Sequence, residues 1–396
     1  MKERLDDLAI FGGAPEFSEK LHVGRPNIGD RQRLLGRLNE MLDRRYLSND
    51  GPFVRELEER IAKYLGVRHC VAICNGTIAL EILIRAIGLT GEVIVPAFTF
   101  VATAHALKWQ GIEPVFCDVD AGTHCLNADA VEQKITTKTT GIIGVHLWGR
   151  TCPVDDLAAL ASRSGVELIY DAAHAFGASA AGRMVGNFGR AEVLSFHATK
   201  FFNSFEGGAI VTNDNALADR CKLMRNFGFA GFDNVIYIGT NGKMTEVCAA
   251  MGLTSLDSLD DFIETNRVNY QRYQSLLAGV PGVSMVAYST TERSNYQYVV
   301  LEIDDKLAGC HRDAVQRVLT AENVMARRYF YPGVHRMEPY RSTRPELSMP
   351  ITEGISERVL SLPTGTSVDS TVIEQICQII RFTVAHGRVV SLRLRD

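Results

Sequence analysis

The stretch CVAICNGTIALEILIRAIGLTGEVIVPAF, residues 70–98, decides the fold. It opens with a short apolar run (70–74) and closes with a second one (92–98). Between them, the apolar residues of TIALEILIRAIG (77–88) recur with helical spacing. A strand, a helix and a strand in this order form the unit from which parallel sheets are built. We therefore expect an α/β fold.

The same alternation continues from about residue 54 to residue 212. The further strand-like runs are PVFCDVD (114–120), TGIIGVHLWG (140–149), VELIYDA (166–172), AEVLSFH (191–197) and GGAIVTN (207–213). These runs are almost continuously apolar, as expected of strands that are covered on both faces. Only nine residues separate the last two runs, too few for a helical crossover, so these two should pair antiparallel. The pattern predicts a seven-stranded, mostly parallel sheet sandwiched by helices.

The pattern changes near residue 256. SLDDFIETNRVNYQRYQSLLAGV (258–280) is typical of one long amphipathic helix, and QYVVLEID (297–304) of a strand. Two more helices are predicted over 311–324 and 369–387. We expect a large domain over residues 1–255, which includes an N-terminal arm, and a smaller C-terminal α/β domain over 256–396.

Composition excludes several classes of protein. Hydrophobic residues make up 46% of the chain, charged residues 22%, and the net charge is only −4, so neither nucleic-acid nor membrane attraction is expected. The nine cysteines form no CxxC pair, which favours reduced, buried thiols over disulfides or a zinc site. No apolar run approaches 18 residues, and the N-terminus does not resemble a signal peptide. A cytoplasmic protein without a metal is expected.

A phosphate site is indicated where the first strand ends. In sheets of this kind, ligands bind at the carboxyl ends of the strands. In CNGTIAL (74–80), Gly76 allows the backbone to approach an anion, and Thr77 adds a hydroxyl. The start of the following helix supplies free N–H groups. The alternative is that Asn75 simply caps this helix.

Two further strand ends carry groups suited to a flat, nitrogen-containing ring. Phe100, in PAFTFVATA (96–104), can stack on a ring or belong to the core. Asp171 ends the strand in IYDAAHAFG (169–177), and a lone buried carboxylate needs a partner such as a protonated pyridine nitrogen. His174 could reach a neighbouring hydroxyl. The alternative for Asp171 is the N-cap of a following helix.

Lys200 lies in the short link between the last two strands, in SFHATKFFNSFEGGA (195–209). Apolar surroundings lower the pKa of a lysine, which makes its amine a nucleophile and a base. Its apolar neighbours are Phe196, Phe201 and Phe202. Ser195 could hold a phosphate. At a fifth strand end, HLWGR (146–150), the sequence does not separate a substrate contact from packing.

These strand ends together offer a phosphate cradle, a stacking ring, a carboxylate for a pyridine nitrogen and a reactive amine. That combination matches the needs of pyridoxal phosphate. The last of these groups, the amine of Lys200, would bind the cofactor covalently.

The sequence resembles the sugar aminotransferases of the DegT/DnrJ/EryC1/StrS family, within the fold-type I pyridoxal phosphate enzymes. The segments that carry the resemblance are LSNDGPFVRELE (47–58), NGTIAL (75–80), PAFTFVATA (96–104), HLWGR (146–150), DAAHAFGA (171–178), SFHATK (195–200), EGGAIVTND (206–214), GTNGKM (239–244), YFYPGVH (329–335) and LSLPTG (360–365).

The resemblance implies a role for each matching residue. Lys200 would carry the cofactor and transfer protons, Asp171 would pair with the pyridine nitrogen, and His174 would contact the side of the ring hydroxyl. The remaining cofactor contacts would be Phe100 on the ring and Gly76, Thr77 and Ser195 on the phosphate. Asn241 would reach the phosphate of a neighbouring subunit, which implies a homodimer with shared active sites. The implied substrate contacts are Ser48, Asn49, Phe205, Tyr331 and His335.

The chain departs from the family pattern at three places. Phe205 replaces a glycine, Gly242–Lys243 replace Tyr–Arg, and Tyr170 replaces an acidic residue. The Phe-Glu-Gly-Gly variant is more similar to the branch that aminates C4 of a dTDP-4-keto-6-deoxyhexose than to the C3-specific branch. The resemblance thus implies transfer of an amino group from an amino acid, expected to be glutamate, to a nucleotide-linked keto sugar in deoxyamino sugar biosynthesis.

Four alternatives remain at this point. One is a C3-specific aminotransferase. A sugar dehydratase of the same fold has histidine in place of the lysine, so Lys200 argues against it. A non-catalytic regulator would need a DNA-binding extension, which the first 45 residues do not resemble. A nicotinamide-dependent dehydrogenase would need G-x-G-x-x-G after the first strand, which CNGTIA lacks.

Overall fold

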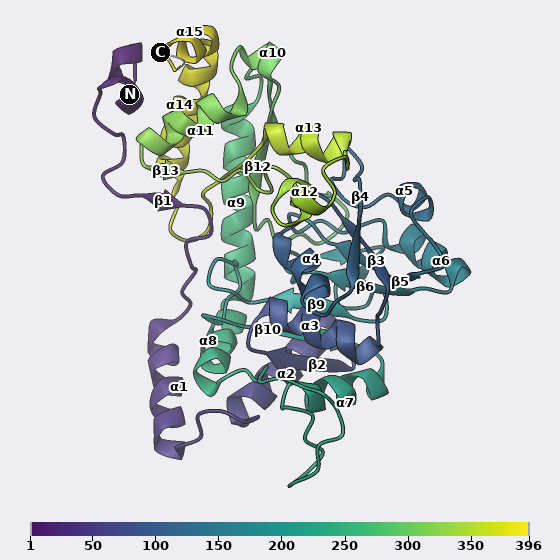
Figure 1. Ribbon diagram of the computed structural model, residues 1–396. Coiled ribbons are helices and arrows are strands. Elements are labelled where there is room, and N and C mark those ends of the chain that lie inside the picture. The colour runs from purple at the N-terminus through teal and green to yellow at the C-terminus, as the bar shows by residue number, and fades with distance from the viewer. Residues whose placement is uncertain (1, 395–396) are drawn as a thin grey trace.

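The computed structural model describes residues 2–394 and confirms the α/β prediction. A seven-stranded sheet lies at its centre, in the strand order β2-β10-β9-β6-β5-β3-β4 (Figure 1). Its strands are β2 (His69–Ile73), β3 (Glu92–Pro96), β4 (Glu113–Cys117), β5 (Thr139–Val145), β6 (Glu167–Asp171), β9 (Glu192–Ser195) and β10 (Gly208–Thr212). All run parallel to one another except β10.

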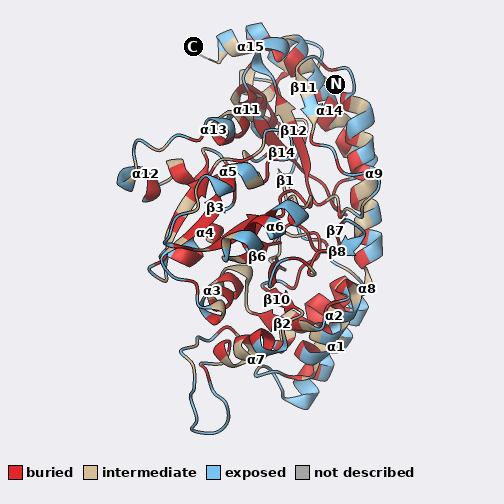
Figure 2. Cartoon of the chain, turned by 90° about the vertical axis from the view of Figure 1, so that its right-hand side faces the viewer, coloured by how far each residue is buried: buried red, intermediate tan, exposed pale blue. Residues whose placement is uncertain are grey.

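The alternation of side chains along the strands supplies a core on each face of the sheet. In β2, for example, Ala72 packs into one core cluster, whereas Val71 and Ile73 pack into another. The helices on the second face are α3 (Gly76–Ile87), α4 (Val101–Lys108) and α7 (Asn215–Met224). Those on the first face are α2 (Pro52–Leu65), α5 (Ala128–Glu132), α6 (Val154–Ser164) and α8 (Glu246–Asp257). Buried side chains thus cover both faces of the sheet, and Figure 2 colours most of its strands as buried.

Strand β10 lies between β2 and β9 and is antiparallel to both, which confirms the predicted hairpin-like pairing. This insertion brings the end of β2 close to the glycines of the EGG segment. A Cβ atom at Gly208 would lie only 2.8 Å from the backbone nitrogen of Gly76. Glycine is therefore required at 208 for the start of α3 to approach the sheet.

The C-terminal part builds a second, smaller unit. Its antiparallel sheet contains β11 (Val283–Met285), β12 (Val299–Ile303) and β14 (Val359–Leu362). The long helix predicted over 258–280 is confirmed as α9 (Leu259–Leu277), and α11 (Arg312–Ala321) and α14 (Ser370–Ala385) complete the layer. The remaining elements are η1 (Leu5–Asp7), η2 (Ala9–Phe11), β1 (Leu21–His22), α1 (Arg31–Arg44), β7 (Ser179–Ala180), β8 (Arg183–Met184), α10 (Asp305–Ala308), β13 (Val324–Met325), η3 (Val334–Arg336), α12 (Tyr340–Thr343), α13 (Pro350–Arg358) and α15 (Gly387–Arg393).

The N-terminal arm packs against the smaller unit. Strand β1 pairs with β13, and Asp6 Oδ1 lies 2.6 Å from Nη1 of Arg393 in α15. The buried carboxylate of Glu322 accepts hydrogen bonds from the backbone N–H groups of Ala9, at 2.8 Å, and Glu16, at 2.7 Å. Leu8 and Phe17 join the core of this unit. The division at 255/256 stays a prediction.

The segment between α7 and α8 projects from the body of the molecule (Figure 1). Its side chains include several exposed apolar groups. Phe232 is 102% exposed and Ile238 is 76% exposed. Among the residues that the structure describes, no helix combines the length and the apolar character needed to cross a membrane.

Candidate active site

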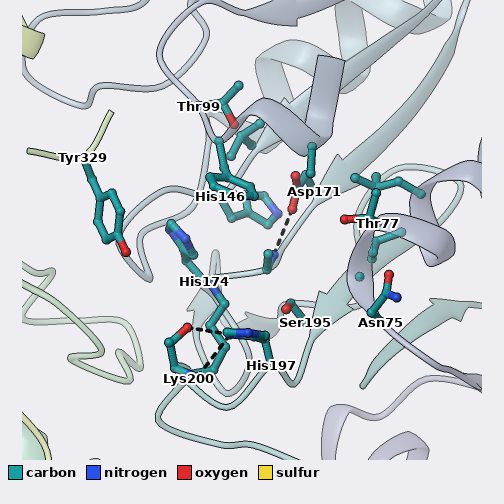
Figure 3. Close-up of a pocket in the computed structure, with 18 of the residues that line it drawn as sticks. Asn75, Thr77, Thr99, His146, Asp171, His174, Ser195, His197, Lys200 and Tyr329 are labelled. Atoms are coloured by element: carbon teal, nitrogen blue, oxygen red, sulfur yellow. Dashed lines mark hydrogen bonds between the residues drawn. The ribbon is translucent and has the colours of Figure 1, made fainter. Parts of the chain in front are cut away.

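A cavity of about 640 Å³ opens where the parallel strands end. On one side it is lined by Arg327, Tyr329 and Phe330 of the smaller unit, and Figure 3 shows Tyr329 across the cavity from Thr77. The residues that line it are Asn75, Gly76, Thr77, Ile78, Leu80, Thr99, Phe100, Ala102, Val145, His146, Asp171, Ala173, His174, Val193, Ser195, His197, Thr199, Lys200, Glu206, Tyr298, Arg327, Tyr329 and Phe330. Seven of the residues predicted from the strand ends therefore meet in one place: Gly76, Thr77, Phe100, Asp171, His174, Ser195 and Lys200.

The start of α3 forms a cradle suited to an anion. The Asn75 side chain caps the helix by accepting a hydrogen bond from the Ile78 N–H at 2.9 Å, so the capping interpretation is correct for this residue. A Cβ atom at Gly76 would lie 3.2 Å from the Cβ of Ser195. The hydroxyl-bearing Thr77 and Ser195 thus flank a helix N-terminus at a point where glycine leaves room for a ligand.

Asp171 lies buried at the end of β6. Thr103 donates its hydroxyl hydrogen to Oδ2 at 2.8 Å, and the Ala173 N–H donates to Oδ1 at 3.1 Å. Burial raises the pKa of this carboxyl group, whereas these two hydrogen bonds and nearby Lys200 oppose the rise. No helix begins directly after Asp171, so its carboxylate is not the cap of one. A cationic ring nitrogen in the cavity would be the charge partner that the buried carboxylate needs.

His174 is held in an aromatic stack. Its ring is nearly parallel to those of Trp148, at 6.2 Å, and Phe330, at 6.0 Å between centroids. The backbone N–H of Trp148 donates to His174 Nδ1 at 3.4 Å, and Tyr298 Oη lies 3.4 Å from Nε2. Burial shifts the pKa of His174 well below its ordinary value, so the imidazole is neutral near pH 7.

The structure shows different surroundings for His146 and Trp148, the two aromatic residues of HLWGR. Trp148 is fully buried and packs behind His174. His146 lines the cavity, but its ring nitrogens face protein groups: Nδ1 accepts from the Cys152 N–H at 3.0 Å, and Nε2 lies 3.2 Å from the buried Glu192 carboxylate. Packing and positioning therefore account for both residues.

Lys200 lies in the turn that follows β9, where its N–H donates to the His197 carbonyl at 2.8 Å. Phe201 and Phe202, which follow it, are buried. Burial lowers the pKa of the Lys200 amine to about 8, although the negative charge of Asp171 acts in the opposite direction. The amine is thus a far better nucleophile near neutral pH than an ordinary lysine.

These residues fit pyridoxal phosphate. The glycine at 76 leaves space for a phosphate, Asp171 presents a buried carboxylate, and Lys200 offers an amine of lowered pKa in the same cavity. Phe100 is 55% exposed although it is aromatic, so its ring is available to pack against a bound ligand.

Comparison with known proteins identifies the family of this chain. Residues 29–381 match the DegT/DnrJ/EryC1/StrS aminotransferase family. The chain belongs to this family.

Individual members of the family align over almost the whole chain. The solved structure of DesI, in the presence of its TDP-sugar product, is 49% identical, with a TM-score of 0.96 over 99% of this chain and 100% of that chain. The dTDP-4-amino-4,6-dideoxy-D-glucose transaminase of Shigella dysenteriae is 36% identical over 92% of this chain and 99% of its own length. A DesV structure from S. venezuelae is 29% identical, with a TM-score of 0.84 over 89% of this chain and 95% of that chain.

The predicted resemblance and the enzyme class are therefore confirmed: the protein is a pyridoxal phosphate-dependent aminotransferase. The fold prediction is confirmed as well, since the DesI structure superimposes over 99% of this chain. Lys200 occupies the position where the dehydratase alternative would have a histidine.

Several lining residues of this aminotransferase were not predicted. Tyr298, Arg327, Tyr329 and Phe330 come from the smaller unit, far from the strand ends in sequence. Thr103, which holds Asp171, belongs to α4. The resemblance in YFYPGVH (329–335) correctly indicated this region, but the residues predicted from it were Tyr331 and His335, whereas Tyr329 and Phe330 line the cavity.

Six predicted residues lie outside the lining of the cavity. Tyr331 packs beneath the guanidinium of Arg328, at 4.6 Å, and His335 is buried with Nε2 3.0 Å from Glu353. Phe205 is 42% exposed beside the lining residue Glu206. The other three are Ser48, Asn49 and Asn241. Their roles stay predictions.

Two of these outlying residues, Asn49 and Asn241, lie in segments near the edge of the sheet. Asn49 lines a separate cavity of about 200 Å³ together with Arg225 and Lys243. Asn241 is exposed, and the carbonyl of the following Gly242 accepts from the Cys74 N–H at 2.8 Å. The GTNGKM segment is therefore tied to the end of β2, on the outside of the sheet.

Proposed function

We propose that this aminotransferase transfers an amino group from L-glutamate to C4 of dTDP-4-keto-6-deoxyglucose. The observation that carries the proposal is the placement of Lys200, Asp171 and the α3 cradle in one cavity. The sugar is suggested by relatives that are named dTDP-4-amino-4,6-dideoxy-D-glucose transaminases, at 36% and 34% identity. None of these names favours the C3-specific alternative.

Pyridoxal phosphate, when bound, supplies an electron-withdrawing ring that stabilises negative charge on a carbon next to the transferred nitrogen. We assign its covalent attachment to Lys200. Asp171 would keep the ring nitrogen protonated, and Thr103 and the Ala173 N–H would hold the Asp171 carboxylate in place. Gly76, Thr77 and Ser195 would bind the phosphate, and Phe100 would pack on the ring.

The proton transfers fall to Lys200. With a pKa of about 8, roughly a tenth of its amine is neutral at pH 7, so Nζ can accept a proton from the donor carbon and return it. His174 is neutral and fixed by its aromatic neighbours, so it can hydrogen-bond to the ring hydroxyl without adding a second positive charge.

We further propose that two copies share their active sites, with Asn241 of each reaching the phosphate bound by the other. Support comes from the projecting segment between α7 and α8, whose exposed apolar side chains, Phe232 and Ile238 among them, would be costly in a monomer. We place the homodimer in the cytoplasm, in the biosynthesis of a deoxyamino sugar such as that of a glycosylated antibiotic.

The test of the proposed function is a product analysis. The purified enzyme, loaded with pyridoxal phosphate, is incubated with glutamate and dTDP-4-keto-6-deoxyglucose, and NMR locates the new amine. We expect the amine on C4. Amination of a 3-keto sugar, with none of the 4-keto sugar, would contradict the assignment of the carbon. No transfer to either sugar would contradict the substrate class.

A further inference from the structure

Arg327 is a cation of the cavity lining that has no acidic partner. It lines the same cavity as Lys200 and Asp171, but unlike Asp171 it is exposed. Within residues 2–394, no carboxylate lies at ion-pair distance from its guanidinium. Its neighbour Arg328 differs, because Nη1 of that residue lies 3.1 Å from Asp313 and its guanidinium covers Tyr331.

The backbone of Arg327 is fixed although its side chain is exposed. Its N–H donates to the Ser361 carbonyl at 3.0 Å, and the Ser361 N–H donates back at 2.8 Å. These two bonds attach it to β14 of the smaller sheet. The guanidinium lies 5.4 Å from the centre of the Tyr329 ring, which limits its freedom. The cation is therefore held beside the cavity before any ligand arrives.

The other charged groups of the lining are already engaged. Asp171 is buried among hydrogen-bond donors, and Lys200 is assigned to the cofactor. His197 and Glu206 form a pair, with Nε2 and Oε1 3.4 Å apart. In the described part of the chain, Arg327 is thus the one permanently charged lining group left for a substrate.

Both substrates of the proposed reaction carry an oxyanion at a distance from the reacting carbon. In the nucleotide sugar this oxyanion is the diphosphate, and in glutamate it is the side-chain carboxylate. We propose that Arg327 binds this distal oxyanion and so sets which ligands are accepted at the cavity. The inference rests on the proposed function, because it takes its ligands from that reaction. A planar guanidinium suits both groups, since it can donate two parallel hydrogen bonds.

The test compares Arg327→Gln and Arg327→Lys with Arg328→Gln in the enzyme loaded with pyridoxal phosphate. Arg328→Gln removes the same charge one residue away, from a side chain that does not line the cavity. Calorimetry measures the binding of two probes that cannot react, thymidine diphosphate and glutarate. We expect Arg327→Gln to lower the affinity for at least one probe by about 10- to 100-fold and Arg327→Lys to retain part of that affinity. Arg328→Gln should leave the affinity for both probes nearly unchanged.

Each outcome has a definite meaning. If Arg327→Gln binds only thymidine diphosphate more weakly, the diphosphate is the ligand of Arg327. If it binds only glutarate more weakly, the ligand is the donor carboxylate. Weaker binding of both probes shows that Arg327 binds the two groups in turn. Unchanged binding of both probes, or an equal loss in Arg328→Gln, would overturn the proposal. Turnover of the keto sugar by the wild-type enzyme is measured in parallel. Turnover with unchanged probe binding in Arg327→Gln contradicts this inference alone, whereas absent turnover contradicts the proposed function.

Discussion

The lining of the cavity and the exposed segments around residues 46–52 and 226–245 differ in one basic way. In the lining, groups from five strand ends meet because parallel strands end at one edge of a sheet. In the exposed segments, the residues assigned to the site by resemblance, such as Asn49 and Asn241, remain outside the cavity of their own chain. A single chain therefore contains the chemistry of the site but not all of its predicted contacts.

The two regions therefore act in different places. Lys200 and Asp171 belong to the cavity of their own chain, so changing either should abolish or cripple that cavity. If Asn241 contributes at all, it must do so in another copy.

The largest effect is expected from Lys200→Ala. Without the amine, neither covalent attachment of the cofactor nor the proton transfer has a substitute in the cavity, and the turnover rate should fall by about 10⁴-fold. A steady-state assay with glutamate and the keto sugar measures the loss, with Lys306→Ala as the control, since Lys306 is exposed and does not line the cavity. Multiple turnover at a near-normal rate in Lys200→Ala would break the assignment.

Asp171→Asn is expected to cost less, on the order of 10²- to 10³-fold in rate. Asparagine keeps the shape and can still hydrogen-bond, but it carries no negative charge to keep a ring nitrogen protonated. The rate and the absorbance of the bound cofactor report the change. A rate within a few-fold of wild type would show that Asp171 is only a structural carboxylate.

Mixing variants tests the exposed region directly. If each site takes Lys200 from one chain and Asn241 from the other, mixed dimers of Lys200→Ala and Asn241→Ala contain one intact site. Random pairing at equal concentrations should then recover about one quarter of the wild-type activity. A mixture of Lys200→Ala and Asp171→Asn should recover nothing, because both residues line the same chain's cavity. No recovery in the first mixture would place Asn241 in the site of its own chain beside Lys200, and full activity of Asn241→Ala alone would place it outside the site.

The pH dependence of cofactor uptake tests the lowered pKa of the Lys200 amine. Burial lowers the Lys200 pKa to about 8, so the neutral amine grows about tenfold between pH 7 and pH 9. Uptake of pyridoxal phosphate by the cofactor-free enzyme, followed by absorbance, should rise through a midpoint near 8. In Asp171→Asn the midpoint should fall, because the Asp171 charge raises the Lys200 pKa. A midpoint near that of an ordinary lysine, about 10.4, would contradict the burial of the amine.

The smallest effect concerns the exposed Phe205, whose φ of 62° lies in the left-handed region that favours glycine. Phe205→Gly should relieve this strain, partly offset by the greater freedom of glycine in the unfolded chain, and raise the free energy of unfolding by about 0.5 kcal/mol. Urea denaturation measures the change. Phe227→Gly is the matched control, since Phe227 has a φ of 57°. A rise in the KM for the sugar in Phe205→Gly alone would support the predicted substrate contact, and a loss of stability would contradict the strain argument.

The sheet and the residues at its strand ends were predictable because short segments of sequence indicate them. Asp171 and Gly76 each follow or end an apolar run, so the sequence itself marks where these strands end. The parallel arrangement then brings those ends together. The insertion of β10 between β2 and β9 was less evident, because nothing in GGAIVTN shows which second neighbour it pairs with. Its glycines, required at 208 by the approach of α3, were the available signal.

The rest of the site depends on contacts between distant parts of the chain. Arg327 and Tyr329 reach the cavity only because the smaller unit packs over the strand ends. The N-terminal arm likewise pairs with β13, about 300 residues away in sequence, and no local pattern predicts this parallel pairing. Thr103 could have been noticed, since it lies in the first turn of a helix that follows a strand end, but a threonine in that position has no distinctive pattern.

The most direct test of the central claim is to identify the residue that carries the cofactor. The enzyme loaded with pyridoxal phosphate is reduced with borohydride and digested, and mass spectrometry locates the modified lysine. The account predicts one modified residue, Lys200, in the segment SFHATK (195–200). A modification at another lysine, or none in an enzyme that still transfers amino groups, would contradict it.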